Sequence, residues 1–345
     1  MINIALSTLQ QVAAHFVGNN ANGDPLKLSE GPFELHDDNL VGLLRSYFLG
    51  NFTTPEFYSF TFSNEDFTLN PLYRFASDIF DDPYSLFDNS INIAKHLFGA
   101  TQHPNIKAGE LYVAYVKGIE IDGILYDGVG IFKSENKENY LKLTRDFELY
   151  TDEGTNVRKL DKGCVILDTE RESGFKVMIV DNVNKSDAHF WKHDFLNVRP
   201  QSDAFHHTSN FMNMTRQYVA EQLSEEFNVS KAEKIDLLNR SVEFFKSNEE
   251  FSKAEFETSV LGDADVIESF RNYGKNFMSE NEFDAVDQFE ISAQAVKRQA
   301  KVFKTVLKLD KNFHIYIHGS RELIEKGFDE VQGKHYYKLY FDSES

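Results

Sequence analysis

Cysteine, glycine and proline are all scarce in this 345-residue sequence, and each scarcity excludes a class of protein. The single cysteine, Cys164, cannot form a disulfide within the chain, which excludes a disulfide scaffold and fits a reducing compartment. Nineteen glycines and seven prolines are too few for extended low-complexity linkers. We therefore expect a compact globular chain.

Long apolar runs are also missing. The longest apolar stretches, such as residues 111–116 and 177–180, are far shorter than the roughly 20 residues that a membrane-spanning helix needs. The amino terminus, MINIALSTLQQ, has no basic start and is interrupted by polar side chains, so no signal peptide is indicated. These features predict a cytoplasmic protein without membrane contact.

Positive charge is in the minority. The 36 lysines and arginines are outnumbered by 55 acids, which gives a net charge of −19 at pH 7. Because affinity for DNA comes largely from cations that displace condensed counterions, a uniformly acidic surface would be repelled by it. Any contact with DNA must therefore come from a local basic patch or from a partner protein.

Aromatic residues are abundant, with 32 phenylalanines and 15 tyrosines to fill hydrophobic cores. The length predicts about two domains. We place the boundary where strand-like patterning gives way to helical patterning, which divides the chain into a mixed α+β domain, 1–200, and a helical region with a carboxyl-terminal hairpin and final strand, 201–345. The predicted fold class is α+β.

The first domain combines helices with an antiparallel meander. Helical spacing of apolar residues predicts a helix over 39–49 and another over 78–98 that is interrupted at Pro83. Alternation with a period of two predicts strands at 110–121 and 124–132, with a turn at Asp122-Gly123, and a further pair at 163–169 and 175–180. The simplest arrangement has helices packed on one face of this sheet.

The second half begins its helices with recognisable signals. Ser230 and Glu233 form a capping-box pattern, and Ser252 begins a second one in which Phe251 and Phe256 occupy the positions of a hydrophobic staple. Ser292 is positioned to cap a short basic helix. We expect a hairpin of strands 302–309 and 313–318, then a helix over 320–326 that Gly327 ends, and a last strand over 335–341.

One stretch of the chain, residues 294–311, has the composition of a DNA contact. It contains six cations and a single acid, Asp310. A cationic row on a strand beside a basic helix would touch phosphates without reading sequence, although lysines on an edge strand also serve simply to discourage aggregation. The candidate DNA-binding residues are Lys297, Arg298, Lys301, Lys304, Lys308 and Lys311.

An acidic block precedes this basic stretch. Residues 255–290 contain ten acids and only two bases, Arg271 and Lys275. The block has three readings: it neutralises the basic row within the fold, it docks a basic protein partner, or it is simply a solvated helical surface.

Catalytic signals are weak. Asp127, Glu135 and Lys137 match the pattern by which some nucleases hold Mg²⁺, but such spacings arise freely in acidic sequences. His189 and His193 lack the glutamate of a zinc-protease motif, and Cys164 lies in an apolar strand pattern that is typical of a buried side chain. We therefore expect no enzyme, no metal site and no cofactor.

Several segments resemble bacterial nucleoid-associated proteins of the YejK/NdpA type. The resemblance includes INIALSTLQQV near the amino terminus, FWKHDFLNVRPQSDAFHHTSNF at 190–211, AEKIDLLNRSVEFF at 232–245, SVLGDADVIESFRNYG at 259–274, VLKLDKNFHIYIHG at 306–319 and YYKLYF at 336–341. It implies association with the nucleoid, DNA binding and contacts with DNA-topology enzymes. The family has no defined set of DNA-contacting residues to transfer to this chain.

Three hypotheses follow from the sequence. The first is a nucleoid-associated DNA-binding protein without strong sequence preference. The second is an acidic interaction protein that reaches the nucleoid through a partner such as a topoisomerase, and the third is an Mg²⁺-dependent nuclease built on Asp127, Glu135 and Lys137. If the chain self-associates, a two-fold homodimer is the default expectation.

Overall fold

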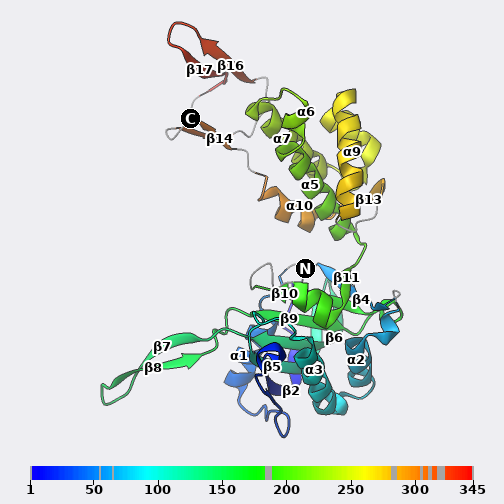
Figure 1. The fold of residues 1–345 in the computed structure, drawn as a ribbon, viewed down its shortest axis with the longest axis vertical. Helices are drawn as coiled ribbons and strands as arrows, with labels where there is room; N and C mark the ends of the chain where they lie inside the picture. The colour runs from blue at the N-terminus through cyan, green and yellow to red at the C-terminus, as the bar shows by residue number, and fades with distance from the viewer. Residues whose placement is uncertain are drawn as a thin grey trace. The chain divides into compact units, whose positions relative to one another are not determined.

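The computed structural model describes residues 2–53, 56–63, 66–182, 189–280, 286–303, 306–309, 313–316 and 323–343. The chain divides into two compact units, Met1–Gln201 (unit 1) and Ser202–Ser345 (unit 2) (Figure 1). The α+β fold class predicted from the sequence is confirmed. Within the described ranges, every helix falls short of the length and apolar character needed to cross a bilayer.

Unit 1 is built on an antiparallel sheet of nine strands. Its strands, in chain order, are β1 (Ile2–Asn3), β2 (Thr8–Val17), β3 (Leu26–Lys27), β4 (Phe57–Phe60), β5 (Gly109–Ile121), β6 (Ile124–Ser134), β9 (Lys162–Leu167), β10 (Lys176–Asp181) and β11 (Val198–Pro200). The spatial order is β11-β4-β10-β9-β6-β5-β2-β3, with β1 paired to β5. A separate hairpin, β7 (Glu138–Leu143) and β8 (Leu149–Gly154), extends away from this sheet in Figure 1.

The turn between β5 and β6 is the one that the sequence predicts. Asp122 and Gly123 both have positive φ, of 50° and 85°, as the two central residues of a type I′ hairpin turn require. Ile121 pairs with Ile124 directly across this turn. The predicted strand pair 163–169 and 175–180 is also present, as β9 and β10, with Lys176 opposite Leu167.

Helices cover both faces of the sheet rather than the one face expected. The helices of unit 1 are α1 (Asp38–Leu49), α2 (Pro71–Asp81), α3 (Leu86–Ala100), short 3-10 turns at Asn20–Asn22, Phe67–Leu69, Pro83–Ser85 and Arg171–Ser173, and a π-helical turn, Phe190–Leu196. On β9, Cys164 and Ile166 pack into the core that contains α2 and α3, while Val165 and Leu167 pack into the core that contains α1. Because side chains alternate along a strand, a fully apolar strand such as β9 indicates a sheet that is buried on both faces.

Unit 2 is a helical assembly around an aromatic core. Its helices are α5 (Ala204–Ala220), α6 (Leu223–Glu226), α7 (Lys231–Ser247), α8 (Lys253–Phe256), a π-helical turn Glu257–Leu261, α9 (Ala264–Glu280) and α10 (Ala293–Ala300). Both predicted helix starts are confirmed: Ser230 and Glu233 form a reciprocal capping box, and Ser252 accepts a hydrogen bond from the Glu255 amide. The Phe251 and Phe256 rings lie 5.8 Å apart within the core.

Three small antiparallel pairs complete unit 2. They are β12 (Glu250–Ser252) with β13 (Gln288–Glu290), β14 (Val306–Leu309) with β15 (Phe313–Tyr316), and β16 (Ile324–Asp329) with β17 (Lys334–Leu339). Of the hairpin expected over 302–309 and 313–318, the structure describes strands at Val306–Leu309 and Phe313–Tyr316, while residues 302 and 303 lie outside a strand.

The helix predicted over 320–326 is wrong where the structure describes it, because Gly327 lies inside strand β16 rather than ending a helix. A Cβ on Gly327 would fall 2.3 Å from the Tyr336 ring on the opposite strand, so this glycine makes room for a cross-strand aromatic ring. Ile324 and Tyr337 of the same hairpin pack against Ile235 of α7. These contacts between distant parts of the chain favour a strand where the local pattern suggested a helix.

Candidate nucleic-acid interface

Helix α10 is held in unit 2 by its cap and by its apolar face. Ser292 accepts a hydrogen bond from the Ala295 amide, and its own amide donates to Thr208 Oγ1 of α5 at 3.0 Å. Ala295 and Val296 are buried, and Val296 belongs to the aromatic core of the unit. Because one face of this short helix is committed to the core, the following cations are turned toward solvent.

The cations of α10 have different surroundings. Lys297 and Lys301 are exposed, lie four residues apart on neighbouring turns, and form no ion pair with the residues that the structure describes. The Arg298 guanidinium lies 6.0 Å from the centre of the Phe205 ring, so this side chain packs on an aromatic surface. Lys297 and Lys301 are therefore the members of the predicted set that the structure presents as available charges.

A groove runs beside these lysines and brings in a cation that the sequence did not indicate. It has a volume of about 740 Å³, and it is lined by residues of α7, β13 and α10. Phe245 and Val296 supply apolar surface, while Lys246 joins Lys297 and Lys301 among its charged residues. We call Lys246, Lys297 and Lys301 the lysine rim. Lys246 lies in the last turn of α7, where a cation is favoured by the helix dipole, so its position on a helix was predictable but its proximity to α10 was not.

Acids also line the groove. Glu249 and Glu290 both contribute to it, and Glu290 pairs across strands β12 and β13 with Glu250. Because like charges repel, these carboxylates weaken the attraction of the lysine rim for a polyanion.

The remaining predicted cations are only partly described. Lys304 and Lys311 lie outside the described residues, and the backbone of Lys308 lies in β14 opposite His314. The cationic row on a strand thus stays a prediction.

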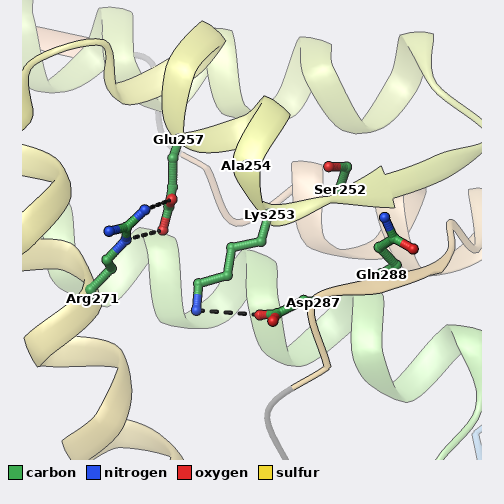
Figure 2. A pocket seen from close by; sticks show the side chains of 7 residues that line it. All are labelled: Ser252, Lys253, Ala254, Glu257, Arg271, Asp287 and Gln288. Carbon is green, nitrogen blue, oxygen red and sulfur yellow. Dashed lines mark hydrogen bonds and ion pairs between the residues drawn. The ribbon is translucent and has the colours of Figure 1, made fainter.

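The acidic block uses its charge locally in the described part of the chain. Figure 2 shows a second cavity, of about 440 Å³, in which Arg271 binds Glu257 with two hydrogen bonds of 2.9 and 2.6 Å. In the same cavity the Lys253 ammonium lies 3.4 Å from Asp287. Both cations of this cavity are neutralised by carboxylates of the same unit. None of the described acids of the block forms an ion pair with the lysine rim, although Glu290 lines the same groove.

The predicted nuclease arrangement does not assemble. Asp127 lies near the start of β6 and accepts a hydrogen bond from the Tyr115 hydroxyl at 2.9 Å, whereas Glu135 follows the other end of the strand. At about 3.3 Å per residue the two carboxylates are about 26 Å apart. Glu135 binds the buried Lys133 ammonium at 2.8 Å, and Lys137 binds Glu110 at 2.6 Å. Each group of the pattern has a separate structural partner.

The other candidates for chemistry show no site in the described ranges. No group of three or more histidine, cysteine, aspartate or glutamate side chains is placed there to hold a metal ion. The rings of His189 and His193 stack with their centres 4.3 Å apart. Cys164 is buried, and burial raises the pKa of its thiol, which disfavours the reactive thiolate.

Comparison with known proteins agrees with the resemblance seen in the sequence. No curated protein matches the chain. The family model described as nucleoid-associated protein YejK matches residues 14–333, which includes the sheet of unit 1 from within β2 onward and the helical core of unit 2. A match over so much of the chain shows its family. The protein belongs to the YejK family of nucleoid-associated proteins.

Proposed function

We propose that this protein binds duplex DNA through its phosphate backbone, without strong sequence preference and without catalysis, and that the lysine rim makes the contact. The observation on which the proposal rests is that Lys297 and Lys301 are exposed and form no ion pair with the described residues. Membership of a nucleoid-associated family supports the same role, with the nucleoid of the cytoplasm as its location. No cofactor is required for such binding.

The electrostatics set the strength of this binding. A lysine ammonium is a compact point charge that contacts phosphate oxygens, which are the same in every base pair, so the contact carries no sequence information. The net charge of −19 opposes the approach of any polyanion. We therefore expect weak binding that is strongly favoured by low salt.

Salt dependence tests the proposal. The slope of log Kobs against log salt is negative, and each phosphate contact that is lost makes it less steep by about 0.9. The Lys297→Gln, Lys301→Gln double variant should therefore reduce the magnitude of the slope by about 1.8 for every duplex sequence tested. The matched control is Lys253→Gln, which removes the same charge from a lysine of unit 2 that already binds Asp287. This control should leave the slope unchanged.

Two results would contradict the proposal. One is the absence of any duplex binding by the purified protein at low salt. The other is a double variant whose salt slope equals that of the unmodified protein.

A second function is favoured by a different observation. The groove beside the lysine rim has apolar surface from Phe245 and Val296 and also contains Glu249 and Glu290, a mixture more typical of protein docking than of phosphate contact. We propose as the alternative that the chain reaches the nucleoid through a protein partner such as a topoisomerase. Crosslinking in cells, with and without nuclease treatment, separates the two: partner contacts that survive removal of DNA favour this alternative.

A further inference from the structure

The hairpin β7–β8 of unit 1 is exposed along nearly its whole length. Its two strands pair with each other as a separate two-stranded sheet, and every residue of β7 is exposed. Both outer edges therefore present backbone groups without a strand partner among the described residues. An isolated two-stranded sheet is at best marginally stable in water, and open edges are templates for pairing with another chain.

The two faces of this hairpin differ. On one face the Tyr140 hydroxyl donates to Asp152 at 3.1 Å, and the Lys142 ammonium lies 5.5 Å from the centre of the Tyr150 ring. Tyr140 and Asp152 thus satisfy each other, whereas Lys142 contacts a ring and forms no ion pair with the described residues. The other face carries three exposed leucines near the tip of the hairpin: Leu141, Leu143 and Leu149 are 70%, 60% and 64% exposed.

The two edges differ in charge as well. Strand β8 contains Asp152 and Glu153 and no cation, so pairing β8 with itself would place acids beside acids. Strand β7 instead contains Glu138 and Lys142, which lie symmetrically two residues before and two residues after Tyr140. An antiparallel pairing of β7 with a second β7 about Tyr140 therefore places Glu138 of each copy opposite Lys142 of the other. This edge is complementary to itself.

We propose that β7 is a self-association edge, at which the hairpins of two copies join antiparallel about Tyr140 into one four-stranded sheet. The occupant of the edge is thus a second copy of this chain, related to the first by a two-fold axis. This inference is independent of the proposed DNA binding, because it concerns unit 1 alone.

The pattern of backbone hydrogen bonds within the hairpin supports this register. The Thr144 amide donates to the Glu148 carbonyl at 3.0 Å just beyond the last strand pair, Leu143 with Leu149. Because bonded and non-bonded pairs alternate along an antiparallel ladder, the backbone groups of Asn139 and Leu141 point outward from β7. Pairing about Tyr140 sets Asn139 of each copy opposite Leu141 of the other, so outward groups meet outward groups.

Side-chain packing at the seam follows from the same register. Tyr140 of one copy lies opposite Tyr140 of the other in a non-hydrogen-bonded pair, where side chains approach most closely. On the opposite face, Leu141 of each copy lies diagonally across the axis from the other, which covers part of the exposed leucine surface. The seam is only about 20 Å long at about 3.3 Å per residue. One strand edge of this length buries a smaller area than the standard interface of about 800 Å² per partner. The dimer should therefore form in a concentration-dependent way.

Cysteine crosslinking tests the register directly, because the only native cysteine, Cys164, is buried. In a non-hydrogen-bonded pair the two Cα atoms lie about 4.5 Å apart, within the range of a disulfide. Tyr140→Cys should give a covalent dimer under mild oxidation. Lys142→Cys is the matched control on the same strand, since the register separates it from its own copy by four residues, or about 13 Å. Thr151→Cys is the control on β8.

A charge swap provides a second test in solution. Glu138→Lys alone places lysine opposite lysine twice, and should lower dimer affinity roughly tenfold in sedimentation over a range of concentrations. Combining it with Lys142→Glu restores both opposite-charge pairs and should recover the affinity. Glu153→Lys makes the same charge change on β8 and should leave dimerisation intact.

Clear results would overturn the proposal. It fails if Tyr140→Cys crosslinks no better than Thr151→Cys, or if Leu141→Cys forms the disulfide instead. It also fails if the unmodified chain stays monomeric at every concentration, or if the double swap behaves like the single reversal. Circular dichroism of each variant establishes that the unit remains folded in these comparisons.

Discussion

In unit 1 the side chains of Lys133 and Lys162 are 0% and 1% exposed, and their ammonium groups lie 2.8 and 3.0 Å from Glu135 and Asp181. In unit 2, Lys297 and Lys301 are exposed and form no ion pair with the described residues. The same residue type thus has two roles. The buried lysines are neutralised within the fold and are unavailable to any ligand, whereas those on α10 are exposed to solvent.

The buried lysines also show why unit 1 needs its carboxylates. Lys133 and Lys162 are directly opposite each other in the pairing of β6 with β9. Burial lowers the pKa of Lys133, and the neighbouring Lys162 lowers it further, while Glu135 raises it. Two like charges in a dry environment are tolerated only if each has a partner. The net composition of a chain therefore says little about which cations remain free to bind.

The largest loss of stability is expected for Lys133→Met. The substitution keeps the length of the side chain but leaves the Glu135 carboxylate buried without its cation, which typically costs about 3–5 kcal/mol of unfolding free energy. Urea unfolding followed by circular dichroism measures the loss. The control, Lys297→Met, should change stability little because its charge is exposed and forms no ion pair in the part of the chain that the structure describes. Adding Glu135→Gln to Lys133→Met should recover part of the loss, and an unaltered midpoint for the single variant would show that the pair is not desolvated.

Local signals in the sequence were sufficient for much of the fold. The turn at Asp122-Gly123 and the caps at Ser230, Ser252 and Ser292 depend on residues within one turn of each other, and the structure contains all of them. Strand β16 was missed because it is stabilised by contacts that local spacing does not reveal. One is with Tyr336 on the neighbouring strand and the other is with α7, which is distant in the sequence. From its neighbours Lys326 and Phe328 alone, Gly327 could equally end a helix or leave room for an aromatic ring.

The candidate site was predictable only in part for the same reason. Lys297 and Lys301 follow a cap and lie on one helix, so their exposure follows from local spacing. Lys246 joins them only because α7 and α10 both contribute to one groove. The ion pair of Glu135 with Lys133 was also not predictable. Lys133 is only two residues away, but the local sequence does not show that both side chains are buried.

The ion pair of Arg271 with Glu257 in unit 2 is intermediate between the buried and the exposed lysines. Arg271 in unit 2 is 56% exposed, but its partner Glu257 is only 3% exposed. Arg271→Met leaves a buried carboxylate that water can approach from the side that the guanidinium occupied, so its loss of stability should be smaller than that of Lys133→Met. Lys253→Met, which breaks the more exposed pair with Asp287, should have almost no effect. Thermal unfolding of the three variants should give this order, and an Arg271 variant as damaging as Lys133→Met would show that burial of one partner alone sets the cost.

The smallest expected effect concerns protons in unit 1. His15 is buried, and burial lowers its pKa below the ordinary 6.5. Its Nδ1 accepts from the Ser29 amide at 3.2 Å, and its Nε2 lies 2.9 Å from Ser90 Oγ, which itself donates to the Phe87 carbonyl. The neutral ring with hydrogen on Nε2 satisfies both contacts. Protonation of Nδ1 would break the contact with the Ser29 amide.

The sign of the pH effect follows from this arrangement. Because the pKa of His15 is lower in the folded state, the unfolded chain takes up the proton first, so the contribution of His15 to stability is complete above pH 6.5 and is lost as the pH falls through the folded value. Burial also lowers the pKa of His96, and the contact of its ring with the Phe195 carbonyl opposes this change. The free energy of unfolding, measured from pH 7.5 to pH 5, should therefore fall less steeply for His15→Gln than for the unmodified chain. His96 should account for part of the remaining slope. Equal slopes would mean that His15 is hydrated in solution.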